Sequence, residues 1–456
     1  MKVLWICNLI LPEIAASMGL GTIPKEGWVK GLLDAMLALK HSESNVTDFD
    51  IAFAFPVSKA VIDASENADS RGFISGTAKL QEYPDLTVEY YGFYEDTAHE
   101  SVYDAKLEEC FRGIIDIAKP DIVHSFGTEF PHTLAAAKVW NNPKKMLIGI
   151  QGPCTVYAER YTSHLPENIV KRHTFRDFLK KDSILEQKGK YTARGDNERA
   201  AVRLAGHIAG RTAFDKSLAN AWNETATYHY AGETLRKDFY SGEWKAENAE
   251  KYRIFVSQAD YPLKGFHFLL MAVGDILANS KENGIGDIQI YVAGQSIVDV
   301  DSLKKKIKIS SYGKYLRQMM DEYGVSDRVH ILGRLSAEQM KEQYLKCDTY
   351  VCCSECENSP NSLGEAMILK VPIVTAEVGG ITSVFETGAD GYSYRNEPDD
   401  SLQEVADALK NALLERWNAD DVDIRRNSAC EHAHRNHDPE KNARGMIDIY
   451  SEMMKG

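Results

Sequence analysis

Short apolar runs alternate with helix-length segments along nearly the whole chain, and this alternation limits the fold more than any other feature of the sequence. Strands that alternate with helices form parallel sheets with helices on both faces. The pattern therefore predicts an α/β fold. In the first half, strand-like runs occupy residues 3–10, 49–55, 87–91, 122–124 and 146–150, and helix-length segments occupy 28–40, 101–118 and 134–140.

The alternation stops in the polar stretch 238–250 and restarts at residues 252–257. A chain of 456 residues is also too long for one ordinary core. We therefore predict an N-terminal domain over 1–243, a second domain over 244–437, and a terminal helix over 438–456 that packs back on the first domain. In the second domain we expect strands at 252–257, 288–293, 329–332, 349–353 and 373–375, with helices at 264–279, 337–346 and 362–369.

The N-terminus, residues 2–10, imitates a signal peptide, because one lysine precedes an apolar run. Asn8, Pro12 and Glu13 interrupt that run early, so we interpret it as a buried first strand. No run reaches the 18 or so apolar residues of a membrane span. The sequence thus predicts a cytoplasmic protein whose membrane contact, if it has one, is peripheral.

The eight cysteines do not form a disulfide framework in a chain of this length, which fits a reducing compartment. Cys353 and Cys356 have the spacing of a metal-binding or redox pair, but zinc requires a second pair. Cys430 and the histidines that follow it are interpreted as a solvated helix end. We expect neither a metal site nor a cofactor.

A net charge of −14 argues against general binding of nucleic acid. The segment 160–203 differs, because it contains more lysine and arginine than acid. It overlaps residues 165–222, which we interpret as a helical insertion in the N-terminal domain. The basic segment is either a solvated helical face or a contact for an anionic acceptor or for lipid headgroups at the inner face of a membrane.

The most informative residues are 354–367. Pro360, Asn361 and Ser362 mark a helix start directly after a predicted strand. This places a helix N-terminus at the carboxyl edge of a parallel sheet, where its amides and dipole favour a phosphate. Glu365 lies just inside the helix, where it can accept hydrogen bonds from a ribose diol. Glu357 lies in the preceding loop and faces the same cleft; a plain helix cap is the alternative.

These residues resemble the GT4 family of retaining glycosyltransferases, whose hallmark is two glutamates separated by seven residues. Glu357 and Glu365 have that spacing, and Ala366-Met367, the sequence VPIV at 371–374 and Gly379-Gly380 follow in the family's order. The resemblance implies the GT-B fold, in which two Rossmann-like domains face each other across a cleft. It also implies that Asn361, Ser362 and Leu363 contact a nucleotide-sugar donor.

The resemblance extends upstream to residues 255–265. Lys264 matches the lysine that grips the donor diphosphate in the family, although a surface lysine is the alternative. The family's arginine falls on Gln258, a departure that removes one positive charge. Arg334, in the stretch 331–335, is similar to the family's loop beside the nucleotide base.

In the first half, Glu26, Gly27 and Trp28 resemble the glycine loop that approaches the donor from the opposite domain; a plain turn is the alternative. Trp28 is also a candidate acceptor contact. His124 and Glu129 follow a strand and are placed near the cleft. We assign Glu129 to the acceptor, and His124 is either catalytic or a buried core histidine.

Gln151 stands where many relatives carry a histidine, and an amide cannot act as a base. Its catalytic role is therefore hydrogen bonding to a sugar or an acceptor hydroxyl. Arg211 is a candidate second contact for the donor phosphate that compensates for Gln258. The alternative is an ion pair of Arg211 with Asp215.

The resemblance implies a metal-independent transferase that moves a hexose-type sugar from a nucleotide diphosphate, with UDP favoured, to a saccharide or lipid-linked acceptor in surface polysaccharide or glycan assembly. Lys264 and the helix start at Asn361 would stabilise the departing diphosphate. Two other readings stay open. One is another GT-B enzyme, such as a sugar-nucleotide epimerase or a phosphorylase. The other is a non-catalytic nucleotide-sugar binding protein.

Overall fold

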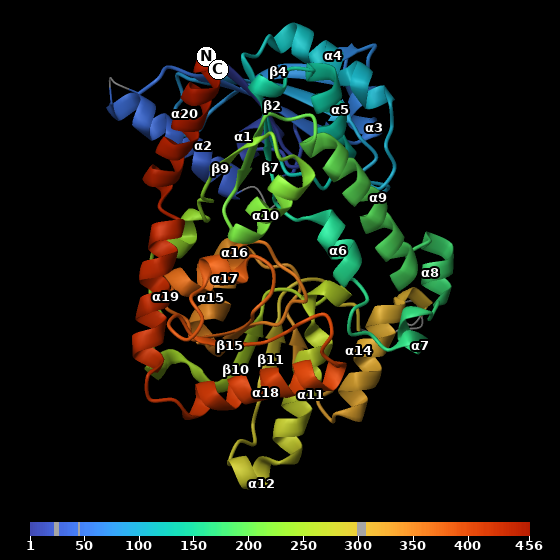
Figure 1. The fold of residues 1–456 in the computed structure, drawn as a ribbon, viewed down its shortest axis with the longest axis vertical. Coiled ribbons are helices and arrows are strands. Elements are labelled where there is room, and N and C mark those ends of the chain that lie inside the picture. The colour runs from blue at the N-terminus through green and yellow to red at the C-terminus, as the bar shows by residue number, and fades with distance from the viewer. Residues whose placement is uncertain (22–26, 44–45, 299–306) are drawn as a thin grey trace. The chain divides into compact units, whose positions relative to one another are not determined.

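The computed structural model describes residues 1–21, 27–43, 46–298 and 307–456. Contacts divide the chain into two compact units. Unit 1 comprises residues 1–155, 190–235 and 437–456, and unit 2 comprises residues 156–189 and 236–436. Each unit is an α/β layer structure with helices on both faces of one sheet (Figure 1). The predicted α/β fold is confirmed.

Unit 1 contains a nine-stranded sheet in the order β3-β4-β5-β2-β1-β6-β7-β8-β9. It is parallel except where β4 pairs antiparallel with β3 and β5. Its strands are β1 Lys2–Ile6, β2 Asp50–Val57, β3 Ala68–Asp69, β4 Phe73–Lys79, β5 Thr87–Tyr94, β6 Ile122–Phe126, β7 Met146–Gly149, β8 His207–Gly210 and β9 Thr227–Tyr230. Its helices are α1 Pro12–Ser17, α2 Gly27–Ser42, α3 Lys59–Ala64, α4 Lys106–Ala118, α5 Pro131–Trp140, η1 Pro143–Lys145, α10 Ala213–Trp222 and α20 Pro439–Lys455.

The first strand shows why the N-terminal apolar run is buried. Successive side chains of a strand point to opposite faces of the sheet. Trp5 joins the core beneath α2 and α20, whereas Leu4 and Ile6 join the core beneath α4 and α5. Both faces of β1 are therefore covered, and the interpretation as a buried first strand is confirmed. In the described ranges, no helix combines the length and the apolarity needed to cross a bilayer.

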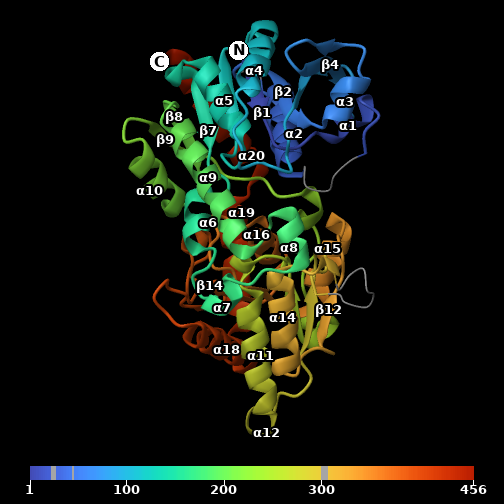
Figure 2. The same cartoon turned by 90° about the vertical axis from the view of Figure 1, so that its right-hand side faces the viewer.

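Unit 2 contains a parallel six-stranded sheet in the order β12-β11-β10-β13-β14-β15. Figure 2 labels two of its strands, β12 and β14. Its strands are β10 Glu250–Val256, β11 Gln289–Val292, β12 Val329–Ile331, β13 Cys347–Cys352, β14 Ile373–Ala376 and β15 Tyr392–Tyr394. Its helices are α7 Glu167–Val170, α8 Phe175–Lys180, η2 Lys237–Tyr240, η3 Ala246–Asn248, η4 Pro262–Lys264, α11 Phe266–Ala278, α12 Ser280–Asn283, α14 Ser311–Glu322, α15 Ala337–Lys346, α16 Asn361–Ile368, α17 Ile381–Val384, α18 Leu402–Asn418 and α19 Val422–Asn436. The division between the units falls within two further helices, α6 Cys154–Arg160 and α9 Ile184–Val202.

Two features differ from the sequence analysis. Residues 156–189 belong to unit 2, although we placed them in the N-terminal domain. The reason is that buried side chains of this segment bond within unit 2: His164 contacts Glu355, and Asp177 accepts a hydrogen bond from the Ser311 amide. The stretch 165–222 is also not wholly helical, because it includes the four-residue strand β8, which pairs with β7.

The terminal helix α20 belongs to unit 1, where it packs against α2. Its apolar side chains recur at helical spacing and enter the core of that unit. The crossing of the C-terminal helix back to the N-terminal part is therefore present in the structure. The buried residues are Ala443, Met446, Ile447, Ile449, Tyr450 and Met453.

Candidate active site

The first cluster of candidate residues lies in unit 2, where the strand order changes direction. β10 is flanked by β11 and β13, and later strands are added outward on either side. At such a switch point the loops that follow neighbouring strands diverge and leave a crevice at the carboxyl edge of the sheet. Lys264 follows β10 in η4, and Glu357 follows β13. The fold therefore brings together two residues that are far apart in the sequence.

Lys264 is partly buried and Glu357 is buried, and they form an ion pair in which Lys264 Nζ donates to Glu357 Oε1 at 2.6 Å. Ser354 Oγ donates to the same oxygen at 2.8 Å. The close approach depends on Gly265, which has a φ of +63° and whose Cβ, if present, would lie 1.8 Å from the carbonyl oxygen of Cys353. Burial favours the neutral amine, but the Glu357 carboxylate outweighs it and holds the pKa of Lys264 well above its usual value.

The start of α16 lies on the same loop as Glu357. No side chain of the described residues caps this helix, so its first amides are available to a ligand. Asn361 Oδ1 is buried and has no hydrogen-bond partner in the described parts of the chain. Ser362 Oγ accepts from Tyr350 at 2.9 Å, which ties the helix start to β13. Leu363 is fully buried and packs in the core.

Glu365 is buried one turn into α16 and pairs with Arg236. Both Nε and Nη2 of Arg236 donate to Glu365 Oε1, at 3.0 and 2.6 Å. Tyr344 donates to the other oxygen at 3.4 Å. Burial raises the pKa of Glu365 to about 7, although the Arg236 guanidinium favours the ionised form. Arg236 was not predicted from the sequence, because no local spacing links it to a residue 129 positions away.

The other candidates of unit 2 are less enclosed. Gln258 lies two residues beyond the end of β10 and is half-buried. Arg334 is exposed in the loop between β12 and α15. Both follow strands of the sheet at its carboxyl edge, as the sequence indicated. The structure brings Lys264 and Glu357 into direct contact, but it gives Glu365 a separate partner.

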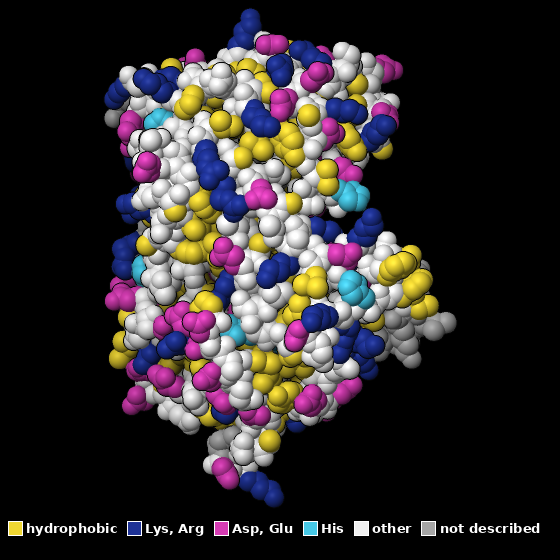
Figure 3. Space-filling view, turned by 45° about the vertical axis from the view of Figure 1, so that its right-hand side comes forward, with side chains coloured by type: hydrophobic (Ala, Val, Ile, Leu, Met, Phe, Trp, Pro, Cys, Tyr) yellow, Lys and Arg dark blue, Asp and Glu magenta, His cyan; other side chains and the backbone are white. Residues whose placement is uncertain are grey.

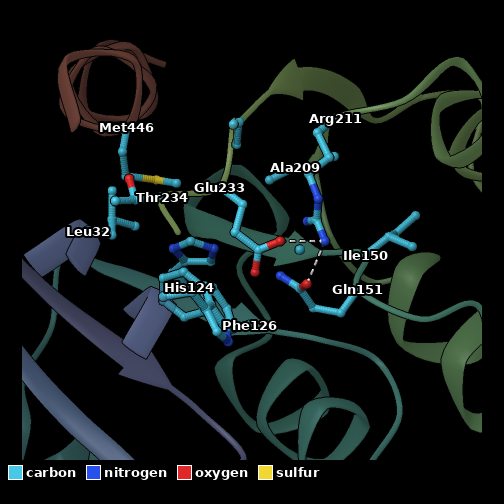
Figure 4. Close-up of a pocket in the computed structure, with 15 residues that line it drawn as sticks. Leu32, His124, Phe126, Ile150, Gln151, Ala209, Arg211, Glu233, Thr234 and Met446 are labelled. Carbon is cyan, nitrogen blue, oxygen red and sulfur yellow. Dashed lines mark hydrogen bonds and ion pairs between the residues drawn. The ribbon is translucent and has the colours of Figure 1, made fainter. Parts of the chain in front are cut away.

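The second cluster of candidates lines a small pocket in unit 1 that is partly open to solvent. The pocket lies at the carboxyl ends of β6, β7, β8 and β9, with α2 and α20 completing its wall (Figure 4). Its lining is largely apolar and includes Trp28, Leu32, Phe126, Ala209 and Met446. Polar groups enter from the strand ends.

Arg211 is the centre of the polar side of this pocket. Its Nη2 lies 2.8 Å from Glu233 Oε2 and donates to Gln151 Oε1 at 2.9 Å (Figure 4). Its Nε is buried with no hydrogen-bond partner among the described residues. The alternative considered for Arg211, an ion pair with Asp215, is not the contact observed, because the Asp215 carboxylate accepts from the backbone amides of Arg211 and Thr212 and so caps α10. Arg211 pairs with Glu233 instead.

His124 lines the same pocket but is a buried side chain of β6. Its Nδ1 is 2.6 Å from the hydroxyl of Tyr450 on α20. Burial lowers the pKa of His124 to about 3, so the imidazole is neutral at neutral pH. A group with that pKa is a weak base, since a general base works best with a pKa near the working pH.

The remaining candidates of unit 1 lie near the first helix and after β6. Gly27 is the first residue of α2, and the Trp28 ring centroid is 5.5 Å from that of Phe126. Glu26 lies outside the described residues. Glu129 is not among the residues that line the pocket. Its Oε1 accepts from the Gly152 amide at 3.1 Å, and burial raises the pKa of Glu129.

The cysteines are all buried as unpaired thiols, Cys353 and Cys356 included. Burial raises the pKa of Cys356 to about 12, which keeps it protonated. Within the described ranges, no three histidine, cysteine or acidic side chains are grouped as a metal site. The buried thiols therefore act as small apolar side chains in packing.

The fold is that of known glycosyltransferases with the GT-B architecture. Sucrose-phosphate synthase from Thermosynechococcus elongatus aligns over 100% of both chains with a TM-score of 0.64 and 13% identity. HepE of Anabaena, solved in complex with UDP, aligns over 99% of this chain and 100% of that chain with a TM-score of 0.58 and 14% identity. The catalytic domain of starch synthase IV from Arabidopsis thaliana, bound to ADP and acarbose, aligns over 100% of both chains with a TM-score of 0.56 and 11% identity.

The second unit also matches a family by sequence. Residues 237–423 match the model of glycosyl transferases group 1. The phosphatidylinositol N-acetylglucosaminyltransferase GPI3 subunit of Saccharomyces cerevisiae is 23% identical over 173 residues, which are 38% of this chain and 34% of that protein. The match thus spans about a third of that relative's length. The resemblance to glycosyltransferases indicated by the sequence motifs is therefore confirmed for residues 237–423 at the level of the group 1 model.

Proposed function

We propose that the protein is a retaining glycosyltransferase that moves a hexose-type sugar from a nucleotide diphosphate donor, UDP favoured, to a saccharide or lipid-linked acceptor in the assembly of surface polysaccharide or other glycans. The observation that carries this proposal is the ion pair of Lys264 with the buried Glu357 beside the uncapped start of α16. Lysine and helix amides together form a site for a diphosphate. The site lies within the stretch that matches the family.

In this proposal the bond between the anomeric carbon and the diphosphate breaks first. Lys264, held in its charged form, and the amides of Asn361 and Ser362 stabilise the negative charge that develops on the leaving group. Glu357 lies beside that lysine and orients the donor sugar or stabilises its oxocarbenium form. The departing phosphate takes the proton of the acceptor hydroxyl.

We assign Glu365 to the pentose of the donor nucleotide. A ribose diol offers two hydroxyl donors, and an ionised carboxylate accepts both. Arg236 fixes the orientation of Glu365 through its two hydrogen bonds and favours the ionised form. Arg236 is therefore a positioning residue for the donor.

We assign the pocket of unit 1 to a neutral, hydroxylated part of the acceptor. The charge of Arg211 is offset by Glu233, and the neighbouring His124 is neutral, so the pocket has little attraction for a phosphate. The buried Arg211 Nε and Thr234 Oγ1 have no hydrogen-bond partner among the described residues and can bond ligand hydroxyls. Trp28 and Phe126 offer apolar faces to a sugar ring.

The proposal is tested by incubating the protein with a panel of nucleotide sugars, with and without candidate acceptors, and measuring the nucleotide released. We expect release of one nucleoside diphosphate that depends on the acceptor and falls when Lys264 is changed to alanine. A change of the sugar without release would instead indicate an epimerase. A thermal shift with nucleotide and no release under any condition would indicate a binding protein.

A further inference from the structure

Helix α8 presents three large apolar side chains to solvent. Phe175, Phe178 and Leu179 are 62%, 76% and 64% exposed. Their spacing of three and four residues places them on one face of the helix. Single exposed apolar side chains are ordinary on protein surfaces, but a contiguous group marks an interaction site. Figure 3 shows hydrophobic side chains gathered at the right-hand edge of the view, where α8 lies.

The inner side of α8 is fixed by a buried carboxylate. Asp177 is fully buried, caps the helix by accepting from the Thr174 amide, and accepts from the Ser311 amide at the start of α14, both at 3.0 Å. Arg176 pairs with Asp177 and with Asp182. A charge is buried at a cost unless it is bonded in this way. These contacts hold the opposite, apolar face outward.

The segment that carries the apolar face is rich in positive charge. The segment 171–181, which we call the α8 patch, contains five lysine and arginine residues and one acid. That acid is the buried Asp177, and the chain as a whole has a net charge of −14. Lys171, Lys180 and Lys181 are exposed, and Lys171 forms an exposed pair with Glu167. The positive sign is therefore a local feature of this patch.

We infer that the α8 patch binds an anionic lipid bilayer. In this arrangement Phe175, Phe178 and Leu179 enter the boundary between headgroups and acyl chains, while Lys180 and Lys181 contact lipid phosphates. A protein partner fits less well, because interface cores are depleted of lysine. The inference narrows the membrane contact indicated by the basic stretch 160–203 to one helix, and it does not depend on the identity of the sugar.

The test is co-sedimentation of the full chain with vesicles of phosphatidylcholine alone and of phosphatidylcholine with 30% phosphatidylglycerol, taking about 30% as a physiological anionic fraction. We expect binding to the anionic vesicles only, weakened by salt. The triple variant Phe175→Ser, Phe178→Ser, Leu179→Ser should lose at least about tenfold in partitioning. Lys180→Glu with Lys181→Glu should lose about fivefold or more for each charge.

The matched control is Ile424→Ser, which changes a side chain that is 74% exposed on α19. It should leave vesicle binding unchanged, and all variants should bind nucleotide as the wild type does. Absence of binding to either vesicle would overturn the inference, as would an equal loss in Ile424→Ser. It would also be overturned if sedimentation velocity showed a dimer that the triple variant abolishes, because the apolar face would then join two copies of the chain.

Discussion

The Lys264 cluster of unit 2 and the Arg211 pocket of unit 1 contain the same kind of ion pair in different surroundings. Both place a largely buried cation beside a carboxylate at the carboxyl edge of a parallel sheet. In unit 2 the pair stands beside an uncapped helix start. In unit 1 it stands in a pocket with largely apolar walls and a neutral histidine. The first arrangement adds positive potential for an anion, whereas the second offers hydrogen bonds to an uncharged group.

An ion pair between a cation and a carboxylate therefore does not by itself identify a phosphate site. What surrounds the pair decides which ligand it favours, because a helix terminus adds partial positive charge and apolar walls do not. Four predictions test whether unit 2 binds the anionic donor and unit 1 the neutral part of the acceptor.

The largest effect is expected for Glu357→Gln, which keeps the shape of the side chain and removes its charge. Turnover should fall by about 10²–10³, the usual loss when an electrostatic contact to the transition state is removed. Nucleotide affinity should change only a few-fold, since Lys264 and the α16 amides remain. Steady-state kinetics and calorimetric titration with the nucleotide measure the two quantities.

The matched control for that variant is Glu355→Gln on the same loop. Glu355 is also buried, but it pairs with His164 at 2.8 Å rather than with Lys264. Turnover should be far less affected than in Glu357→Gln. Equal losses in both variants would mean that the loop has collapsed and that Glu357 has no special role.

The next effect concerns the pH dependence of donor binding. Because burial raises the pKa of Glu365 to about 7, its ionised fraction rises from about one tenth at pH 6 to about nine tenths at pH 8. If the ionised form accepts the ribose hydroxyls, the affinity for UDP-glucose should rise up to about ninefold over that range. UDP-glucose is the proper probe because its phosphates do not titrate there. Titrations at both pH values measure the change.

Glu365→Gln is the control for this titration, since the amide cannot ionise. Its affinity should be weaker at pH 8 and nearly constant with pH. A wild-type affinity that is flat between pH 6 and pH 8, or that rises equally in the variant, would show that Glu365 does not contact the nucleotide.

A smaller effect is expected in unit 1 for Arg211→Met, which removes the donors of the pocket. Loss of one or two hydrogen bonds to a neutral ligand should raise the KM for the acceptor about fivefold. The KM for the donor should stay within about twofold. Arg203→Met, at an exposed arginine outside the pocket lining, is the control. A selective loss of donor affinity would show that Arg211 binds the donor diphosphate. The two regions would then not differ in the kind of ligand that they bind.

The two regions also differ in how far the sequence predicts them. Glu357 and Glu365 follow one strand within a single motif, and Lys264 follows the neighbouring strand β10, so local spacing and the rule for parallel sheets suffice. The partners of these residues were not predicted. Arg236 reaches Glu365 across 129 positions, and Tyr450 reaches His124 across 326 positions. Such pairs depend on tertiary packing, which one sequence does not reveal.

The same reasoning explains the strand β8. His207–Gly210 is only four residues long and follows a charged helix, so periodicity cannot separate it from its surroundings. For Arg211, at its end, the alternative to a donor contact was an ion pair with the nearest acid, Asp215, whereas that carboxylate is used to cap α10. Glu233, which follows the next strand, is close in space but not in sequence.

The smallest effect tests whether His124 belongs to the core or to the chemistry. Tyr450→Phe removes a buried hydroxyl 2.6 Å from His124 Nδ1 and should lower the free energy of unfolding by about 1 kcal/mol. Tyr230→Phe, at a ring that is 52% exposed, should have almost no effect. Urea denaturation measures both variants. Turnover should be unchanged in Tyr450→Phe, because a histidine whose pKa burial lowers to about 3 contributes to packing rather than to proton transfer. A loss of turnover with unchanged stability would place His124 in the reaction and make the unit 1 pocket catalytic.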